Sequence, residues 1–280
     1  MASQSPIAPP PGSPAILILA GKRDGRLDPL AEQAGVSHKA VVPIRGKPLI
    51  VWVLEAAEAA WPDSPIYVSI HDAAVIAGLP IVARLQAAGR LIAVPAGPGI
   101  VESLEAVVAA AGDRAWPMLV TTADNVLVTP EALRRLHDEA VRDGAGAALS
   151  VASREQILAA HPEGQRRFYE FADVAISNCN AYWLADAAAL RAAESFRGGG
   201  QFIKTPGAIL KAFGLWNLIG FRRRWWSLDR IMANLSRRFG VRVRPVFVTD
   251  GALAVDVDNP RTYAIAEVLL ASRKPEAREA

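Results

Sequence analysis

Residues 15–26 read AILILAGKRDGR, a run of six apolar residues followed by a basic loop that contains two glycines. An apolar run without alternation is typical of a strand covered on both faces, as in a mainly parallel sheet. The loop begins where the strand ends, and in such sheets ligands bind beyond the carboxyl ends of the strands. This stretch therefore predicts a fold class and the edge of the sheet where function resides.

Strands and helices alternate from this point to residue 151. Strands are predicted at 15–20, 66–70, 91–94, 118–122 and 147–151, and helices at 48–60, 80–88, 101–111 and 130–142. This alternation predicts an α/β fold with a doubly wound, mainly parallel, Rossmann-like sheet. Two more strands, at 169–173 and 178–184, are predicted to pair as a small extra sheet, and a helix is predicted at 227–239.

The composition excludes several classes of protein. Of the 280 residues 51% are hydrophobic, which is too many for a disordered chain. The 31 basic residues nearly balance the 28 acidic ones, whereas a nucleic-acid binder concentrates excess positive charge. The single Cys179 cannot form an internal disulfide, and no uncharged apolar run reaches the roughly 18 residues of a spanning helix. We therefore expect a cytoplasmic protein.

A single domain is expected at 15–271, because no repeat or flexible linker divides it. Residues 1–14 contain five prolines and lack both the basic start and the apolar stretch of a signal peptide. We expect them to be a disordered lead-in. Residues 272–280 are short and charged, which predicts a flexible tail.

A second motif follows the basic loop. Residues 35–40 read GVSHKA and residues 43–50 read PIRGKPLI, so Lys39 precedes an apolar stretch and a G-K-P-L element opens a helix. With the first loop, this pattern resembles the nucleotidyltransferases of the GT-A-like fold, and in particular the NTP transferases similar to the molybdenum cofactor guanylyltransferase. The resemblance covers about 15–150 and 250–270. It implies a nucleotidyltransferase that moves a nucleoside monophosphate from an NTP to a phosphorylated acceptor and releases pyrophosphate.

The resemblance also implies roles for the first loop and the lysine. In this family the loop wraps the triphosphate, which here assigns Ala20, Gly21, Lys22 and Arg23 to nucleotide binding. Lys39 stands where the family has a catalytic lysine that contacts the phosphates. Lys22 replaces the usual second glycine, so its charge substitutes for close approach of the backbone. A solvated lysine at a strand edge is the alternative for Lys39.

A glycine-rich turn follows the strand at 91–94. Gly97 and Gly99 precede Ser103 in the segment PAGPGIVES, residues 95–103. The segment is similar to the part of the family that lies against the nucleobase, which implies that these three residues bind the nucleotide. A plain loop ahead of a helix is the alternative, and the segment does not identify the base.

Acidic residues occur where a metal site is expected. Asp124 ends a buried strand, and a carboxylate there is costly unless a cation or hydrogen bonds compensate it. Residues 254–260 read AVDVDNP, and strand alternation would place Asp256 and Asp258 on one side. The resemblance implies that Asp124 and one of these two aspartates bind Mg²⁺. Asp258 as a helix N-cap before Pro260 is the alternative.

The region at about 155–248 resembles the family only loosely and is expected to form a helical acceptor-side insertion. Asn178 and Asn180 lie on one strand face, where relatives approach the second substrate, so they are candidates for acceptor binding; turn-forming asparagines are equally consistent. Residues 202–226 are rich in aromatic residues and end in three arginines and two tryptophans. This suits an anionic membrane surface and a lipid-like acceptor. Packing on the sheet or in a dimer is the alternative.

Two other functions remain open on the sequence. A nucleotide-sugar-dependent glycosyltransferase shares the fold and also binds its metal through carboxylates. A non-catalytic nucleotide-binding member is consistent with the altered first loop. His38, next to Lys39, is interpreted as a surface residue, with contact to a phosphate as the alternative, and His71 has no partners at metal-ligand spacing. The oligomeric state is not predicted.

Overall fold

The computed structural model describes residues 9–22, 27–190, 220 and 223–273. The strands of the described residues are β1 (Ala15–Leu19), β2 (Pro43–Ile44), β3 (Lys47–Pro48), β4 (Ile66–Ile70), β5 (Leu91–Pro95), β6 (Met118–Thr122), β7 (Ala147–Ser153), β8 (Tyr169–Glu170), β9 (Ala175–Leu184) and β10 (Val243–Phe247). The helices are α1 (Pro29–Gln33), α2 (Leu49–Ala60), α3 (Ala74–Ala77), α4 (Pro80–Ala87), α5 (Ile100–Ala111), α6 (Pro130–Arg142), α7 (Arg154–Ala160), α11 (Leu228–Phe239) and α12 (Pro260–Ser272), and the short 3₁₀ turns are η1 (Lys39–Val41), η2 (Gly112–Ala115), η3 (Ala187–Ala189) and η6 (Gly251–Ala254).

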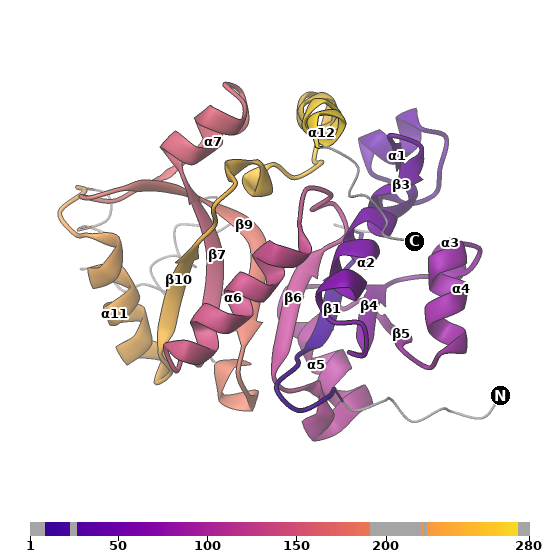
Figure 1. Ribbon diagram of the computed structural model, residues 1–280, viewed down its shortest axis with the longest axis horizontal. Coiled ribbons are helices and arrows are strands. Elements are labelled where there is room, and N and C mark those ends of the chain that lie inside the picture. Colours follow the sequence, from indigo (N-terminus) through magenta and orange to yellow (C-terminus); the bar gives the residue numbers. More distant parts are fainter. Residues whose placement is uncertain (1–8, 23–26, 191–219, 221–222, 274–280) are drawn as a thin grey trace.

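One eight-stranded sheet organises the fold, in the order β10-β7-β9-β6-β1-β4-β5, with β8 paired to β9 (Figure 1). The pairs β1–β4, β1–β6, β4–β5 and β7–β10 are parallel, whereas β9 runs antiparallel to both of its neighbours, β6 and β7. The predicted doubly wound, mainly parallel sheet is confirmed. Because β9 is antiparallel to β6 and Ala181 lies opposite Thr121, the first half of β9 extends past the carboxyl end of β6.

The predicted extra sheet differs in one respect. The strands expected at 169–173 and 178–184 do pair, as β8 and β9. However, β9 is a ten-residue strand that enters the main sheet between β6 and β7, so no separate sheet forms there. The separate two-stranded sheet of the described residues is β2–β3, whose turn contains Arg45 and Gly46 at positive φ.

Helices cover both faces of the sheet. Alternate residues of β1 point to opposite sides: Ile16 and Ile18 join α2, α4 and α6 in one core, and Ala15 and Leu17 join α5 and α11 in another. Both sets are fully buried, which explains why β1 is apolar at every position. The continuous apolar run thus follows from burial on two faces.

A third core cluster lies where the chain returns to the sheet. Val126 and Leu127, which follow β6, pack with Val255, Val257 and the apolar face of α12. The backbone N–H of Val257 donates to the carbonyl oxygen of Asp124 at 3.1 Å. This cluster fixes the segment before α12 against the carboxyl end of β6.

The structure differs from the strand expected here and also excludes the alternative given for Asp258. Residues 254–258 are not a strand: η6 ends at Ala254 and the next four residues are irregular. Nor does Asp258 cap the last helix, because Asn259 does so, accepting from the N–H groups of Arg261 and Thr262, while the Thr262 hydroxyl accepts from the Asn259 N–H. Asp258 is therefore not required to begin α12.

Candidate functional site

The centre of the site is a lysine between two aspartates. Lys39 Nζ donates to Asp124 Oδ2 at 2.5 Å and to Asp258 Oδ1 at 2.8 Å. The Lys39 and Asp124 side chains are only 20% and 18% exposed, whereas Asp258 is 45% exposed. Burial alone would lower the pKa of the Lys39 ammonium, but the two carboxylates raise it above its usual value. The ammonium is a fixed positive charge.

Three segments that are far apart in the sequence bring these side chains together. Asp124 follows β6, and Asp258 is placed by the Val257 bond to the Asp124 backbone. Lys39 is the first residue of η1, not part of a strand edge as one alternative proposed. Although residues 254–258 are not a strand, buried and less buried side chains still alternate here. Val255 and Val257 are fully buried, whereas Asp256 and Asp258 are not.

Asp256 lies next to this ion-pair cluster but has different partners. Its Oδ2 accepts from Asn180 Nδ2 at 2.5 Å, and its Oδ1 is buried and makes no hydrogen bond. Removal from water, together with the charges of Asp124 and Asp258, raises the pKa of the Asp256 carboxyl well above its usual range. A carboxyl group in this setting calls for more positive charge than Lys39 supplies.

The donor set fits a hard divalent cation. Asp124, Asp256 and Asp258 offer carboxylate oxygens, which Mg²⁺ prefers, and the orphaned Asp256 Oδ1 lacks a partner. Within the described part of the chain, no group of three or more His, Cys, Asp or Glu side chains is arranged so that it could hold a metal ion. Mg²⁺ usually takes only one or two carboxylates and completes its shell with phosphates and water.

The loop after β1 lies against two neighbouring loops. The Ala20 N–H donates to Ser69 O at 2.8 Å, and the Lys22 N–H donates to His71 Nδ1 at 3.1 Å. A Cβ on Gly21 would come within 3.3 Å of the Ala96 Cβ, so the glycine permits this close packing. Arg23, also predicted to bind nucleotide, lies outside the described residues. The loop is thus held at the carboxyl edge of β1, β4 and β5.

The turn after β5 is built around its glycines. A Cβ on Gly97 would lie 2.3 Å from the Glu102 Cβ, so only glycine fits. Ser103 is buried; its hydroxyl donates to Gly99 O at 3.0 Å and accepts from the Gly97 N–H at 3.2 Å. Ser103 therefore shapes the turn, and its predicted contact with the nucleotide stays a prediction.

Asn180 contacts Asp256, and Asn178 contacts Asn180. Asn178 Nδ2 donates to Asn180 Oδ1 at 2.7 Å, and Asn180 in turn donates to Asp256. The structure therefore engages both amides within the chain, and the acceptor role predicted for them stays a prediction.

The interpretation of His38 as a surface residue is wrong. His38 is 2% exposed and caps η1, its Nδ1 accepting from the Ala40 N–H at 3.1 Å. Burial, followed by the positive charge of Lys22, lowers the pKa of the imidazole. Its role in the described structure is to shape the turn that presents Lys39.

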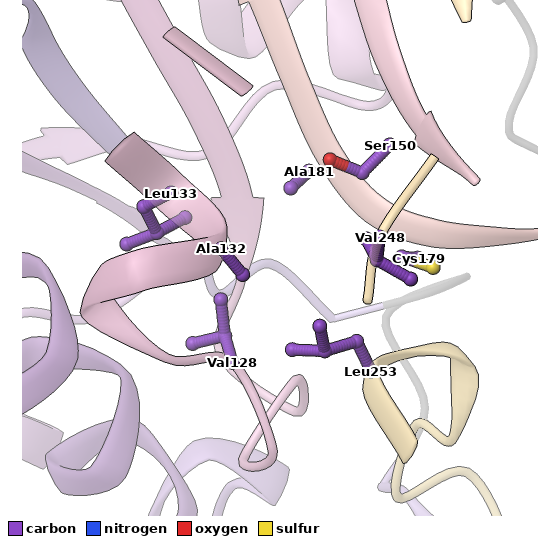
Figure 2. A pocket seen from close by; sticks show the side chains of 8 residues that line it. All are labelled: Val128, Ala132, Leu133, Ser150, Cys179, Ala181, Val248 and Leu253. Carbon is purple, nitrogen blue, oxygen red and sulfur yellow. The ribbon is translucent and has the colours of Figure 1, made fainter. Parts of the chain in front are cut away.

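Cys179 supplies no nucleophile. Its side chain lines a small pocket of about 10 Å³, room for about one water molecule (Figure 2). The other lining residues shown there are Val128, Ala132, Leu133, Ser150, Ala181, Val248 and Leu253. Burial raises the pKa of the Cys179 thiol well above its usual value, so a thiolate is disfavoured.

Most of the segment predicted to touch a membrane, 202–226, lies outside the described residues. In its described part, Trp226 packs with the core that includes α11, whereas Trp225 is 62% exposed with the Arg223 guanidinium over its ring. Among the described helices none is both long and apolar enough to cross a bilayer.

Sequence reasoning missed three residues of the site. His71 supports the first loop, Tyr182 contacts the two asparagines, and Asn125 donates to Thr121 Oγ1 and to the Cys179 carbonyl, tying β6 to β9. His71 directly follows β4, and Asn125 lies in the turn after β6, so the rule that ligands bind beyond strand ends contained a signal for both. Tyr182 had none, because its role depends on β9 entering the main sheet.

Comparison with known proteins agrees with the fold. A family model described as the MobA-like NTP transferase domain matches residues 16–208. A solved hypothetical transferase from Thermus thermophilus is 25% identical with a TM-score of 0.71, and the match covers 89% of this chain and 99% of that one. A CMP:2-keto-3-deoxy-manno-octonic acid synthetase solved with CTP is 16% identical with a TM-score of 0.57, covering 92% and 98%, and shows the shared fold. No curated protein sequence matches the chain.

Proposed function

We propose a function for this chain that starts from its family. The chain belongs to the MobA-like NTP transferase family, because the model of that family matches more than half of its residues. Nucleotidyl transfer is therefore its general activity. The finer proposal is that the chain moves a nucleoside monophosphate from an NTP to a phosphorylated acceptor and releases pyrophosphate, and that it requires Mg²⁺.

One observation carries this proposal: the Lys39 ammonium lies between Asp124 and Asp258 at the carboxyl edge of the sheet. A cluster of carboxylates with one lysine suits a polyphosphate substrate, because the carboxylates bind a cation and the lysine offsets phosphate charge. Catalysis of phosphoryl and nucleotidyl transfer consists largely of positioning and charge neutralisation.

Each residue then has a distinct role. Asp124, together with Asp256 or Asp258, would hold Mg²⁺. The ion, when bound, supplies positive charge to the phosphate oxygens of the NTP. Lys39 neutralises charge on the triphosphate and on the departing pyrophosphate. Asp258, the most exposed of the three carboxylates, is the one most accessible to solvent ions.

No side chain of the protein needs to act as a nucleophile. An oxygen of the acceptor phosphate attacks the α-phosphorus of the NTP and forms the new P–O bond. The bond between the α-phosphorus and the oxygen bridging to the β-phosphate breaks, and pyrophosphate leaves with the electron pair. The buried, protonated Cys179 is consistent with this direct transfer.

The two loops beside the aspartates suit the nucleotide. In this proposal the Gly21–Lys22 loop binds the triphosphate, Arg23 adds its positive charge, and the turn containing Gly97, Gly99 and Ser103 binds the base. The hydrogen bond from the Lys22 N–H to His71 and the tight Gly97 turn support this assignment, because they anchor the described part of each loop without a ligand.

A lipid-like acceptor at a membrane surface is the more specific form of the proposal. It is supported by the exposed Trp225 with Arg223 stacked on it, since both side chains suit a headgroup boundary. Binding to anionic vesicles should be salt-sensitive and should weaken when Arg222, Arg223 and Arg224 are all replaced by glutamine. Equal sedimentation of both proteins with vesicles would favour a soluble acceptor.

Pyrophosphate release tests the function directly. The chain is incubated with Mg²⁺ and each of the four NTPs, with CTP first because a protein of the same fold was solved with it. Acceptor mixtures contain sugar phosphates, lipid phosphates or a 2-keto sugar acid, and Asp124→Asn is the control. We expect release that needs a phosphorylated acceptor and is lost in the control. Release with the sugar acid alone would refute the phosphorylated acceptor, and no release would favour a glycosyltransferase or a non-catalytic nucleotide binder.

A further inference from the structure

The Asn180 side chain is oriented by a chain of hydrogen bonds with only one consistent direction. The Asn180 backbone N–H, which can only donate, points to one end of the Asn178 amide at 3.2 Å, so that end is the oxygen. The Asn178 nitrogen then faces Asn180 at 2.7 Å and the Tyr182 hydroxyl at 2.5 Å. The end of the Asn180 amide that receives these donors must also be its oxygen.

The opposite end of the Asn180 amide is therefore the NH₂ group, and it faces Asp256 Oδ2 at 2.5 Å. The Tyr182 hydroxyl adds a second donor to the Asn180 oxygen at 3.3 Å. Burial raises the pKa of Tyr182 above its usual value, so the phenol keeps the proton that it donates. The chain of hydrogen bonds therefore runs from Asn178 through Asn180 and ends at Asp256, which accepts the last of them.

The backbone of Asn180 adopts an unfavourable conformation in this arrangement. Its φ is +47°, one of three positive values among non-glycine residues in the described part of the chain. Asparagine tolerates this region better than most residues. The pairing of β7 with β9 shifts register between Leu149 and Val151, the stretch opposite Asn180. A local irregularity in β9 thus turns this side chain toward the aspartates.

The amide fixes which oxygen of Asp256 is engaged. Oδ2 is taken by Asn180, while Oδ1 is buried and without a hydrogen bond. Lys39 bonds Asp124 and Asp258, and no hydrogen bond from it to Asp256 is formed. The single amide donor therefore leaves one Asp256 oxygen available beside two further carboxylates.

We propose that Asn180, oriented by Asn178 and Tyr182, is a positioning residue that holds Asp256 with Oδ1 directed to a divalent cation. The inference rests on the proposed function, because it takes the aspartate cluster as the cation site. It assigns the asparagines to Asp256 rather than to the acceptor, and it gives Asp256 a role distinct from that of Asp258, which is exposed and paired with Lys39.

Manganese binding tests this inference without relying on activity. Free Mn²⁺ is measured by electron paramagnetic resonance for the wild type, Asn180→Gly, Asp256→Asn and the double variant. Glycine accepts positive φ, so the fold should persist. Loss of an outer-shell partner typically weakens metal binding by about 10-fold or more, which is the effect we expect for Asn180→Gly. In the Asp256→Asn background the same change should have almost no effect, because Asn180 acts through Asp256.

Two further variants separate positioning from general damage. Arg45→Gly also replaces a positive-φ residue by glycine, but at the exposed β2–β3 turn, and it should bind Mn²⁺ as the wild type does. Tyr182→Phe removes one donor to Asn180 and should weaken binding by a smaller factor than Asn180→Gly.

Three outcomes would reject the inference. Unchanged Mn²⁺ affinity in Asn180→Gly, or an equal loss with and without Asp256, would show that Asn180 does not act through this carboxylate. These results would leave the proposed function standing if the wild type binds Mn²⁺ and releases pyrophosphate. Failure of the wild type to bind Mn²⁺ would overturn the metal site and the inference together.

Discussion

Replacing Lys39 by methionine should destabilise the protein in the absence of divalent cations. Methionine keeps most of the apolar stem but removes the ammonium that separates Asp124 and Asp258. At an effective dielectric constant of about 20, a pair 2.5–2.8 Å apart attracts by roughly 6 kcal/mol before desolvation is subtracted. Removing one partner of a buried ion pair costs about 3–5 kcal/mol, and the exposure of Asp258 favours the lower end.

A loss of about 3 kcal/mol corresponds to a fall in Tm of roughly 6–9 °C for a domain of this size. Thermal unfolding of the wild type and Lys39→Met, with a chelator present, measures it. Millimolar Mg²⁺ should then raise the Tm of the variant more than that of the wild type, because the ion replaces the missing charge.

Lys47→Met is the matched control. Lys47 also forms an ion pair, with Glu55 at 2.7 Å, but both side chains are about two-fifths exposed. Exposed pairs contribute about 0–1 kcal/mol, so its Tm should fall by no more than about 2 °C. Equal Tm values for the two variants, or no response of Lys39→Met to Mg²⁺, would refute the role given to the buried ammonium.

Three other predictions concern the rest of the site. Asp124→Asn keeps the shape of the side chain but removes its charge, so pyrophosphate release should fall by at least about 10²-fold while circular dichroism stays unchanged. Gly97→Ala would place a Cβ 2.3 Å from the Glu102 Cβ and so distort the turn proposed to bind the base; the KM for NTP should therefore rise. An unchanged KM would show that this turn does not bind the nucleotide. The lowered pKa of His38 means that the unfolded chain takes up the proton first, so wild-type stability should decline as the pH falls below about 6.5. His38→Asn keeps an acceptor for the Ala40 N–H, and urea titrations at pH 5 and 7.5 should show a smaller decline.

Much of the fold was predictable because its signals are local. The continuous apolar run of β1 follows from burial on both faces, and Thr129 and Pro130 mark the start of α6 locally, because the Thr129 side chain accepts from the Ala132 N–H. The rule that ligands bind beyond strand ends placed Asp124 at the functional edge. Resemblance to a family then named Lys39 and the second acidic segment.

Other features could not be predicted, because they depend on residues distant in the sequence. The chain alone does not show that β9 enters the sheet between β6 and β7, and only this insertion brings Asn180 to Asp256 across 76 residues. Burial of His38 likewise depends on loops that come later in the chain.

The sequence by itself determined the fold class, the carboxyl edge of the sheet as the functional edge, and the residue types gathered there, because period and strand-end position are local properties. Only the tertiary structure decided how the three aspartates differ. Lys39 forms ion pairs with Asp124 and Asp258, whereas Asn180 donates a hydrogen bond to Asp256. Both arrangements depend on long-range packing, because the core cluster around Val257 fixes the segment that contains Asp256 and Asp258, and strand β9 fixes Asn180.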